Sequence, residues 1–119
     1  MSQYFVTYTT QSSINDVIFH SEVIRCKHPI HWIEKQNTFG DIKFSLIMFK
    51  EYSIVKFHCP IVVSYVSQQG IGDMLFKNET LIHKNPMTWI LDKNKPTSKV
   101  KYALLKFWEY KPQGVFHGR

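Results

Sequence analysis

The sequence predicts an α+β protein with a pseudo-two-fold arrangement, in which one ββαβ unit occurs twice in tandem. The first observation is an internal repeat: residues 4–37 align with residues 61–94 at an offset of 57, and residues 42–52 align with 100–110 at an offset of 58. These segments contain twelve and five identical pairs, so 17 of 45 aligned positions match. The second observation is a length of 119 residues with 44% hydrophobic side chains, which suits one compact core. We therefore expect a single domain over residues 1–119, with repeat one at 1–57 and repeat two at 58–119.

Each copy begins with a predicted hairpin. In the first copy, the β-branched and aromatic runs at residues 4–10 and 17–25 flank a polar turn. In the second copy the corresponding turn contains Gly70 and Gly72, where backbone freedom is needed.

A short helix follows each hairpin, at residues 30–35 and 87–92. Pro29 and Pro86 suit the first helical position, where their missing N–H costs nothing, and Asn85 is a good N-cap. Asn37 and Asn94 are expected to end the helices in the left-handed conformation. Trp32 and its equivalent in the second copy are expected to pack between helix and sheet.

The third strands, at residues 42–52 and 100–110, are apolar on both faces. Strict alternation places Phe44, Leu46 and Met48 on one face and Ile47 and Phe49 on the other. One short helix covers one face, so the second must be buried by the other repeat or by another chain. Two arrangements remain open: a six-stranded sheet with a dimer partner on its far side, or two sheets packed face to face. We favour the continuous or nearly continuous mixed/antiparallel six-stranded sheet, with residues 53–60 as a linker that adds a short strand.

An aromatic first strand, a Gly-rich turn and a Pro-initiated helix form a recognisable motif, which consists of Tyr4-Phe5-Val6-Thr7-Tyr8, Gln11, the Gly-Ile-Gly-Asp turn at residues 70–73, and Pro29-Ile30-x-x-Ile33-Glu34. This motif resembles small uncharacterised proteins of phages and bacterial mobile elements that contain a single copy of the unit. The resemblance covers about one repeat. It implies an accessory gene of mobile origin and brings no activity with it.

Charge and composition narrow the partners. The net charge is +6, and nine basic against four acidic side chains in residues 58–119 account for most of the excess. No apolar run reaches the length of a membrane span, and Cys26 and Cys59 occupy non-equivalent positions in the two copies. We therefore expect a cytoplasmic protein without a membrane partner.

The excess charge concentrates around the helix-to-strand connection of the second copy, in Lys84, Lys93, Lys95, Lys99, Lys101 and Lys106. Such a cluster beside numerous aromatic side chains predicts a surface that binds nucleic acid or an acidic protein. The leading hypothesis is therefore a non-catalytic binding or regulatory protein that acts through a basic and aromatic surface of the second repeat.

The hairpin loops give the alternative hypothesis. Gln11 and Asp16 recur as Gln68 and Asp73, so two equivalent loops would hold a ligand or protein in an inhibitor or immunity-type protein. Side chains of these types more often hold a turn through bonds to the backbone, and we favour that structural role.

Catalytic, metal and cofactor sites are not expected. Cys26, His28 and His31 have ligand-like spacing, but a structural zinc site needs a fourth ligand and the second copy does not repeat the set. Glu22 and its copy Glu79 are better explained as solvent-facing side chains or as cross-strand partners of lysines than as a catalytic pair. A homodimer remains possible, since an apolar face is left over.

Overall fold

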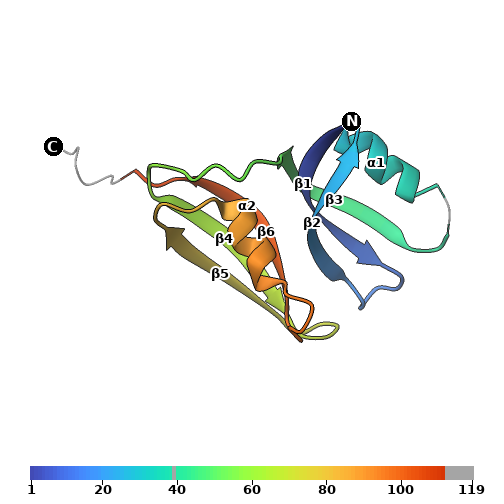
Figure 1. Cartoon of the computed structure of the whole chain (residues 1–119). Coiled ribbons are helices and arrows are strands. Elements are labelled where there is room, and N and C mark those ends of the chain that lie inside the picture. Colours follow the sequence, from blue (N-terminus) through green and yellow to red (C-terminus); the bar gives the residue numbers. More distant parts are fainter. Residues whose placement is uncertain (39, 112–119) are drawn as a thin grey trace, which may run out of the picture.

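The computed structural model describes residues 1–38 and 40–111 and contains two three-stranded antiparallel sheets, each with one helix (Figure 1). The first sheet has the strand order β2-β1-β3 and the second has the order β5-β4-β6. The chain order is β1 (Ser2–Gln11), β2 (Ile18–Cys26), α1 (Pro29–Gln36), β3 (Lys43–Glu51), β4 (Ile61–Gln68), β5 (Met74–Leu81), α2 (Pro86–Lys93) and β6 (Lys101–Glu109). The α+β class and the duplicated ββαβ unit are confirmed, whereas the single six-stranded sheet is wrong.

Both helices begin at a proline that follows a side-chain cap. Asn85 caps α2 as predicted, because its Oδ1 accepts from the backbone N–H of Met87 at 2.8 Å and of Thr88 at 3.4 Å. His28 takes this place before α1, and its Nδ1 accepts from the N–H of Ile30 at 3.1 Å.

The helix ends differ from the expectation. Asn37 has φ −82° and Asn94 has φ −88°, so neither adopts the left-handed conformation. Instead, each amide binds both backbone groups of one residue in the third strand. Asn37 pairs with Phe44 at 2.8 and 2.9 Å, and Asn94 pairs with Tyr102 at 2.6 and 2.7 Å. This two-bond bridge explains the identity at these positions better than backbone freedom does.

A β-bulge changes the faces of the third strands. In β3 the pairing passes from Thr7 opposite Met48 to Tyr8 opposite Leu46, so Ile47 is the extra residue. Strict alternation is therefore wrong for this strand: Leu46 and Phe49 share the helix side, and Met48 lies on the other. The second copy has the same irregularity in β6, between the partners of Ser64 and Tyr65.

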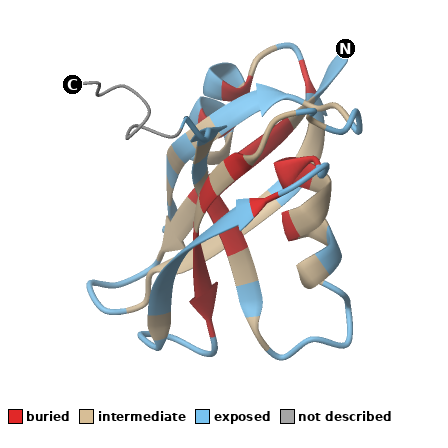
Figure 2. Cartoon of the chain, turned by 90° about the vertical axis from the view of Figure 1, so that its left-hand side faces the viewer, coloured by how far each residue is buried: buried red, intermediate tan, exposed pale blue. Residues whose placement is uncertain are grey.

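The helix side of each sheet is a small core with the predicted tryptophan contact. The ring centroids of Tyr8 and Trp32 are 5.2 Å apart, and those of Tyr65 and Trp89 are 5.1 Å apart, both edge to face. Figure 2 shows that buried positions run along the middle of the molecule while the hairpin ends and loops are exposed.

The two repeats meet where the outer edge of β6 lies on the helix-free face of the first sheet. Thr7 alternates with the helix-facing residues Val6 and Tyr8, so its side chain projects from the opposite face. The hydroxyl of Thr7 donates to the carbonyl of Leu104 at 2.6 Å, and the N–H of Leu104 donates to Ser21 Oγ at 2.9 Å. Ser21 Oγ lies 2.7 Å from Thr7 Oγ1 and donates to it, which closes a ring of three bonds.

This ring explains why one continuous sheet does not form. Side-chain hydroxyls, rather than a neighbouring strand, satisfy the edge of β6 at Leu104. Phe5 and Met48 from the helix-free face of the first sheet pack against the core of the second repeat. The other repeat, rather than another chain, therefore covers the second apolar face of the first sheet. Residues 52–60 contain no strand, and the expected short strand in the linker is therefore wrong.

Candidate functional site

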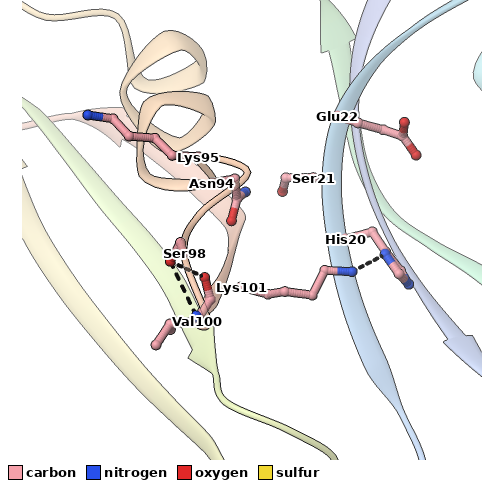
Figure 3. Close-up of a pocket in the computed structure, with 8 residues that line it drawn as sticks. All are labelled: His20, Ser21, Glu22, Asn94, Lys95, Ser98, Val100 and Lys101. Carbon is pink, nitrogen blue, oxygen red and sulfur yellow. Dashed lines mark hydrogen bonds between the residues drawn. The ribbon is translucent and has the colours of Figure 1, made fainter.

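A cavity of about 350 Å³ lies at the junction of the repeats, between β2 and the connection that follows α2 (Figure 3). It brings together polar groups that are far apart in sequence, and its lining consists of His20, Ser21, Glu22, Asn94, Lys95, Ser98, Val100 and Lys101. The cavity therefore contains two of the six lysines that the sequence singled out.

His20 is the central side chain of this cavity. Its Nδ1 lies 2.7 Å from Nζ of Lys101 and its Nε2 lies 2.8 Å from Oγ1 of Thr10, while its ring stacks on Tyr8 at 4.9 Å. A protonated lysine only donates, so Nδ1 accepts and Nε2 carries the proton that is donated to Thr10. Burial, together with the charge of Lys101, lowers the pKa of His20 to about 4, against the weaker opposing effect of Glu22.

The other charged groups of the cavity are also engaged or directed elsewhere. Burial lowers the pKa of Lys101, although the charge of Glu22 opposes this. Glu22 accepts a short hydrogen bond from the hydroxyl of Tyr8, and burial, this bond and the carboxylate charge raise the pKa of that hydroxyl. Figure 3 shows the Lys95 side chain running away from His20. The cavity is thus a satisfied junction between the repeats rather than an open anion site.

The remaining predicted lysines do not form one patch. Lys93 lies over three rings, with Nζ at 4.9 Å from the centroid of Trp89, 5.1 Å from Tyr102 and 6.0 Å from Tyr65. Lys99 lies beside Lys101 at a second hollow near the 68–71 turn, and Lys84 lines a third near Lys56 and Asp92.

Lys106 is on a different surface, the helix-free face of the second sheet. We call this surface the open face, and its residues are Val62, Ser64, Phe76, Asn78, Thr80, Lys106 and Trp108, which share one side by strand pairing and alternation. Nζ of Lys106 lies 5.1 Å from the centroid of Trp108.

The open face is uncovered over much of its area. Trp108 is 42% exposed and Phe76 is 63% exposed. Tyr110, which continues the same side beyond β6 because its N–H donates to the carbonyl of Pro60 at 2.9 Å, is 48% exposed. Among the described residues of the first repeat, Phe19 reaches one end of this face, where its ring centroid lies 6.2 Å from that of Phe76.

The open face was only partly visible in the sequence. The hypothesis of a basic and aromatic surface on the second repeat did not say which aromatic rings are exposed. A signal existed in the repeat: Trp108 and Lys106 stand where the first copy has Lys50 and Met48, so both copies have one lysine on this face and only the second has an aromatic ring beside it.

The two hairpin loops are not equivalent. Asp16 holds its turn, because its carboxylate accepts from the N–H groups of Ser12 at 3.0 Å and Ser13 at 2.6 Å and from the hydroxyl of Ser12, and these bonds lower its pKa. Gln11 donates to the carbonyl of Ile14 at 3.3 Å. In the second loop, Gly70 and Gly72 have φ of 79° and 84°, as their sequence position predicts.

Gln68 has a different role from Gln11. Its side chain is 2% exposed and crosses to the first repeat, where Oε1 accepts from the N–H of Phe19 at 2.9 Å and Nε2 donates to the carbonyl of Val17 at 2.8 Å. Asp73 takes part in the second turn through its backbone carbonyl, which accepts from the N–H of Gln69 at 3.1 Å.

The other sequence candidates have structural partners. His28 caps α1, and its ring centroid lies 6.3 Å from that of His31. Glu79 accepts a hydrogen bond from Tyr65 as Glu22 does from Tyr8. Both carboxylates are exposed, as the solvent-facing alternative predicted, and their hydrogen-bond partners are tyrosines rather than lysines.

Three findings concern the molecule as a whole. Both cysteines are free thiols, and burial raises the pKa of Cys26. Within residues 1–38 and 40–111, no group of three His, Cys, Asp or Glu side chains lies close enough to hold a metal ion, and neither helix is long and apolar enough to cross a bilayer.

Comparisons with known proteins add no relative: no family model, curated protein or solved structure matches the chain.

Proposed function

We propose that this protein is a non-catalytic binding protein for single-stranded nucleic acid and that the open face is its binding surface. The observation that carries the proposal is Trp108, a large aromatic ring 42% exposed on the helix-free face of the second sheet, with the amine of Lys106 5.1 Å from its centroid. Aromatic rings on a sheet stack against bases that a duplex would keep inside, and adjacent lysines contact the phosphates.

The layout of the face supports a strand rather than a duplex. Trp108 and Tyr110 are two residues apart on one side of an extended chain, which separates them by roughly 7 Å. Asn78 and Ser64 lie across from Lys106 in one row and offer hydrogen-bond donors and acceptors to base edges. The helix of the second repeat, α2, lies on the other side of this sheet, so a duplex bound at the open face would not receive that helix in its groove.

Charge supports the same partner. Nine basic against four acidic side chains in residues 58–119 give the second repeat a strongly positive balance. Contacts with phosphates release counterions, so affinity for a single strand should fall with salt at a logarithmic slope of about −0.7 for each phosphate contacted. An acidic protein would share the charge dependence but would not need exposed aromatic rings.

The test is fluorescence anisotropy with labelled single-stranded oligonucleotides and a duplex of equal length, at several salt concentrations. Trp108→Ala should weaken single-strand binding roughly 5- to 150-fold, because stacking contributes about 1–3 kcal/mol per base, whereas Trp108→Phe should retain most of it. Lys106→Ala should make the salt slope shallower by about 0.7.

The matched control is Lys50→Ala, which changes the equivalent of Trp108 in the first repeat and removes an exposed charge of the same sign as Lys106. It should weaken binding less than Trp108→Ala does. Tighter binding to the duplex, or single-strand binding that Trp108→Ala leaves intact, would refute the proposal. Charge reversal at Lys95, Lys99 and Lys101 then tests whether the strand continues toward the connection after α2.

A further inference from the structure

The two repeats are copies of one unit, yet they contact each other through different surfaces. The second repeat contributes the outer edge of β6 at Leu104 and the side chain of Gln68 from the end of β4. We call these two residues, with Val100 and Leu105 on either side of Leu104 along the chain, the docking edge. The first repeat contributes a receiving face, defined by Phe5, Thr7, Ser21 and Met48 and by the backbone of Phe19 at the edge of β2. Such a head-to-tail contact leaves one docking edge and one receiving face unused in every chain.

The unused docking edge is on β3 in the first repeat. Leu46 and Gln11 are identical to Leu104 and Gln68, and β3 has the same register and bulge as β6, so the backbone N–H and C=O of Leu46 point outward from the sheet. Ile42 and Ile47, which correspond to Val100 and Leu105, are 47% and 41% exposed. Apolar side chains thus flank an unpaired strand edge.

The unused receiving face is the open face. Ser64 and Asn78 occupy the positions of Thr7 and Ser21 and lie opposite each other in the strand pairing. Asn78 accepts through Oδ1 and donates through Nδ2, so with Ser64 it can rebuild the ring of bonds around an incoming leucine. Phe76 is identical to Phe19, and its backbone N–H with the carbonyl of Met74 corresponds to the pair that Gln68 binds.

At two positions, apolar side chains on the used surfaces are replaced on the unused surfaces by side chains of opposite charge. Met48 on the receiving face and Leu91 beside the docking edge both pack against the core that joins the repeats. Their equivalents on the unused surfaces are Lys106 and Glu34, which carry opposite charges. Where the contact between the two repeats has two apolar side chains, a contact between two molecules would bring a lysine and a glutamate together.

We infer that the open face of one molecule receives the β3 edge of a second copy of this chain, in a head-to-tail contact that repeats the internal one. Ser64 and Asn78 bind the backbone of the partner's Leu46, and the partner's Gln11 binds the backbone of Phe76. The replacement of apolar by polar side chains makes this contact weaker than the internal one and dependent on concentration. It is independent of the proposed nucleic-acid binding but competes with it, because both partners cover Trp108.

Sedimentation velocity across a wide range of concentrations tests the inference. The wild type should show reversible growth beyond a monomer, and Lys106→Glu and Glu34→Lys should each weaken association about threefold or more, whereas the double variant should recover it. Ile47→Lys blocks only the β3 edge and Asn78→Arg blocks only the open face. Each variant alone should stay monomeric, and their mixture should form a dimer that grows no further.

The mixture also shows that both variants are folded, since an unfolded partner cannot complement. A wild type that is monomeric at every concentration, a mixture that stays monomeric, or an Asn78→Arg variant that still dimerises symmetrically would overturn the inference. Failure of nucleic-acid binding is distinguished by Ile47→Lys, which blocks self-association but leaves the open face unchanged and should still bind a single strand. Oligonucleotide should dissociate the wild-type assembly only if both proposals hold.

Discussion

Gln68→Ala is expected to destabilise the protein far more than the same change at its repeat equivalent, Gln11→Ala. Gln68 is 2% exposed and makes two bonds to the backbone of β2, at 2.9 and 2.8 Å. Each such bond contributes about 0.5–1.5 kcal/mol, and the buried side-chain stem adds to this, so the loss should be about 2–4 kcal/mol. Gln11 is half-buried and makes one bond of 3.3 Å within its own turn, so its loss should stay near 0.5 kcal/mol.

Urea unfolding followed by tryptophan fluorescence measures this difference, at a protein concentration low enough for the monomer. A loss of that size should lower the midpoint for Gln68→Ala by roughly 1–2 M. Gln68→Glu keeps an acceptor for the N–H of Phe19 but places a second acceptor against the carbonyl of Val17, so it should be no milder than alanine at neutral pH. Equal midpoints for the Gln68→Ala and Gln11→Ala variants would refute the idea that Gln68 joins the repeats.

Two further predictions follow from the same structure. Because burial and Lys101 lower the pKa of His20 from 6.5 to about 4, the unfolded chain binds a proton in that pH range that the folded chain does not, and stability should fall as the pH drops through it. After allowance for partial exposure the loss should be about 1–2 kcal/mol, measured by urea unfolding at several pH values. This pH-dependent loss of stability should be present in the His31→Gln variant and absent in the His20→Gln variant. If the unfolding free energy fell equally with pH in both variants, His20 would not be its cause. Asn37→Ala and Asn94→Ala should each cost about 1–3 kcal/mol in thermal or urea unfolding, since both remove a two-bond bridge; a loss confined to one repeat would contradict an equivalent role.

Some errors of the sequence prediction have a common cause, which is that side chains replaced backbone groups as hydrogen-bond partners. Asn37 was expected to end α1 through its own backbone, yet its amide binds Phe44. The six-stranded sheet was favoured as a way to accommodate third strands that are apolar on both faces, yet in the structure Thr7 and Ser21, not a strand of the other repeat, satisfy the edge of β6. Residue type alone does not show which of these partners a polar side chain will find.

The sequence gives the residue types of the candidate site, lysines and aromatic side chains, but not their arrangement in space. The six lysines lie close together in the sequence, but the fold separates them: Lys93 lies over three aromatic rings, Lys101 binds His20, and Lys106 stands beside Trp108. Adjacent positions in a connection and a strand point in different directions, so closeness in sequence did not become closeness in space.

The sequence by itself determined the duplicated ββαβ unit. The hydrophobic pattern and the helix-start prolines depend on local backbone geometry, and the repeated identities show that the unit occurs twice. Tertiary structure decided how the two copies meet and which sheet face stays uncovered. Two copies of one unit can pair symmetrically or head to tail, and the choice depends on long-range contacts such as those of Gln68 and Leu104. That choice buries the helix-free face of the first sheet and leaves Trp108 exposed on the second.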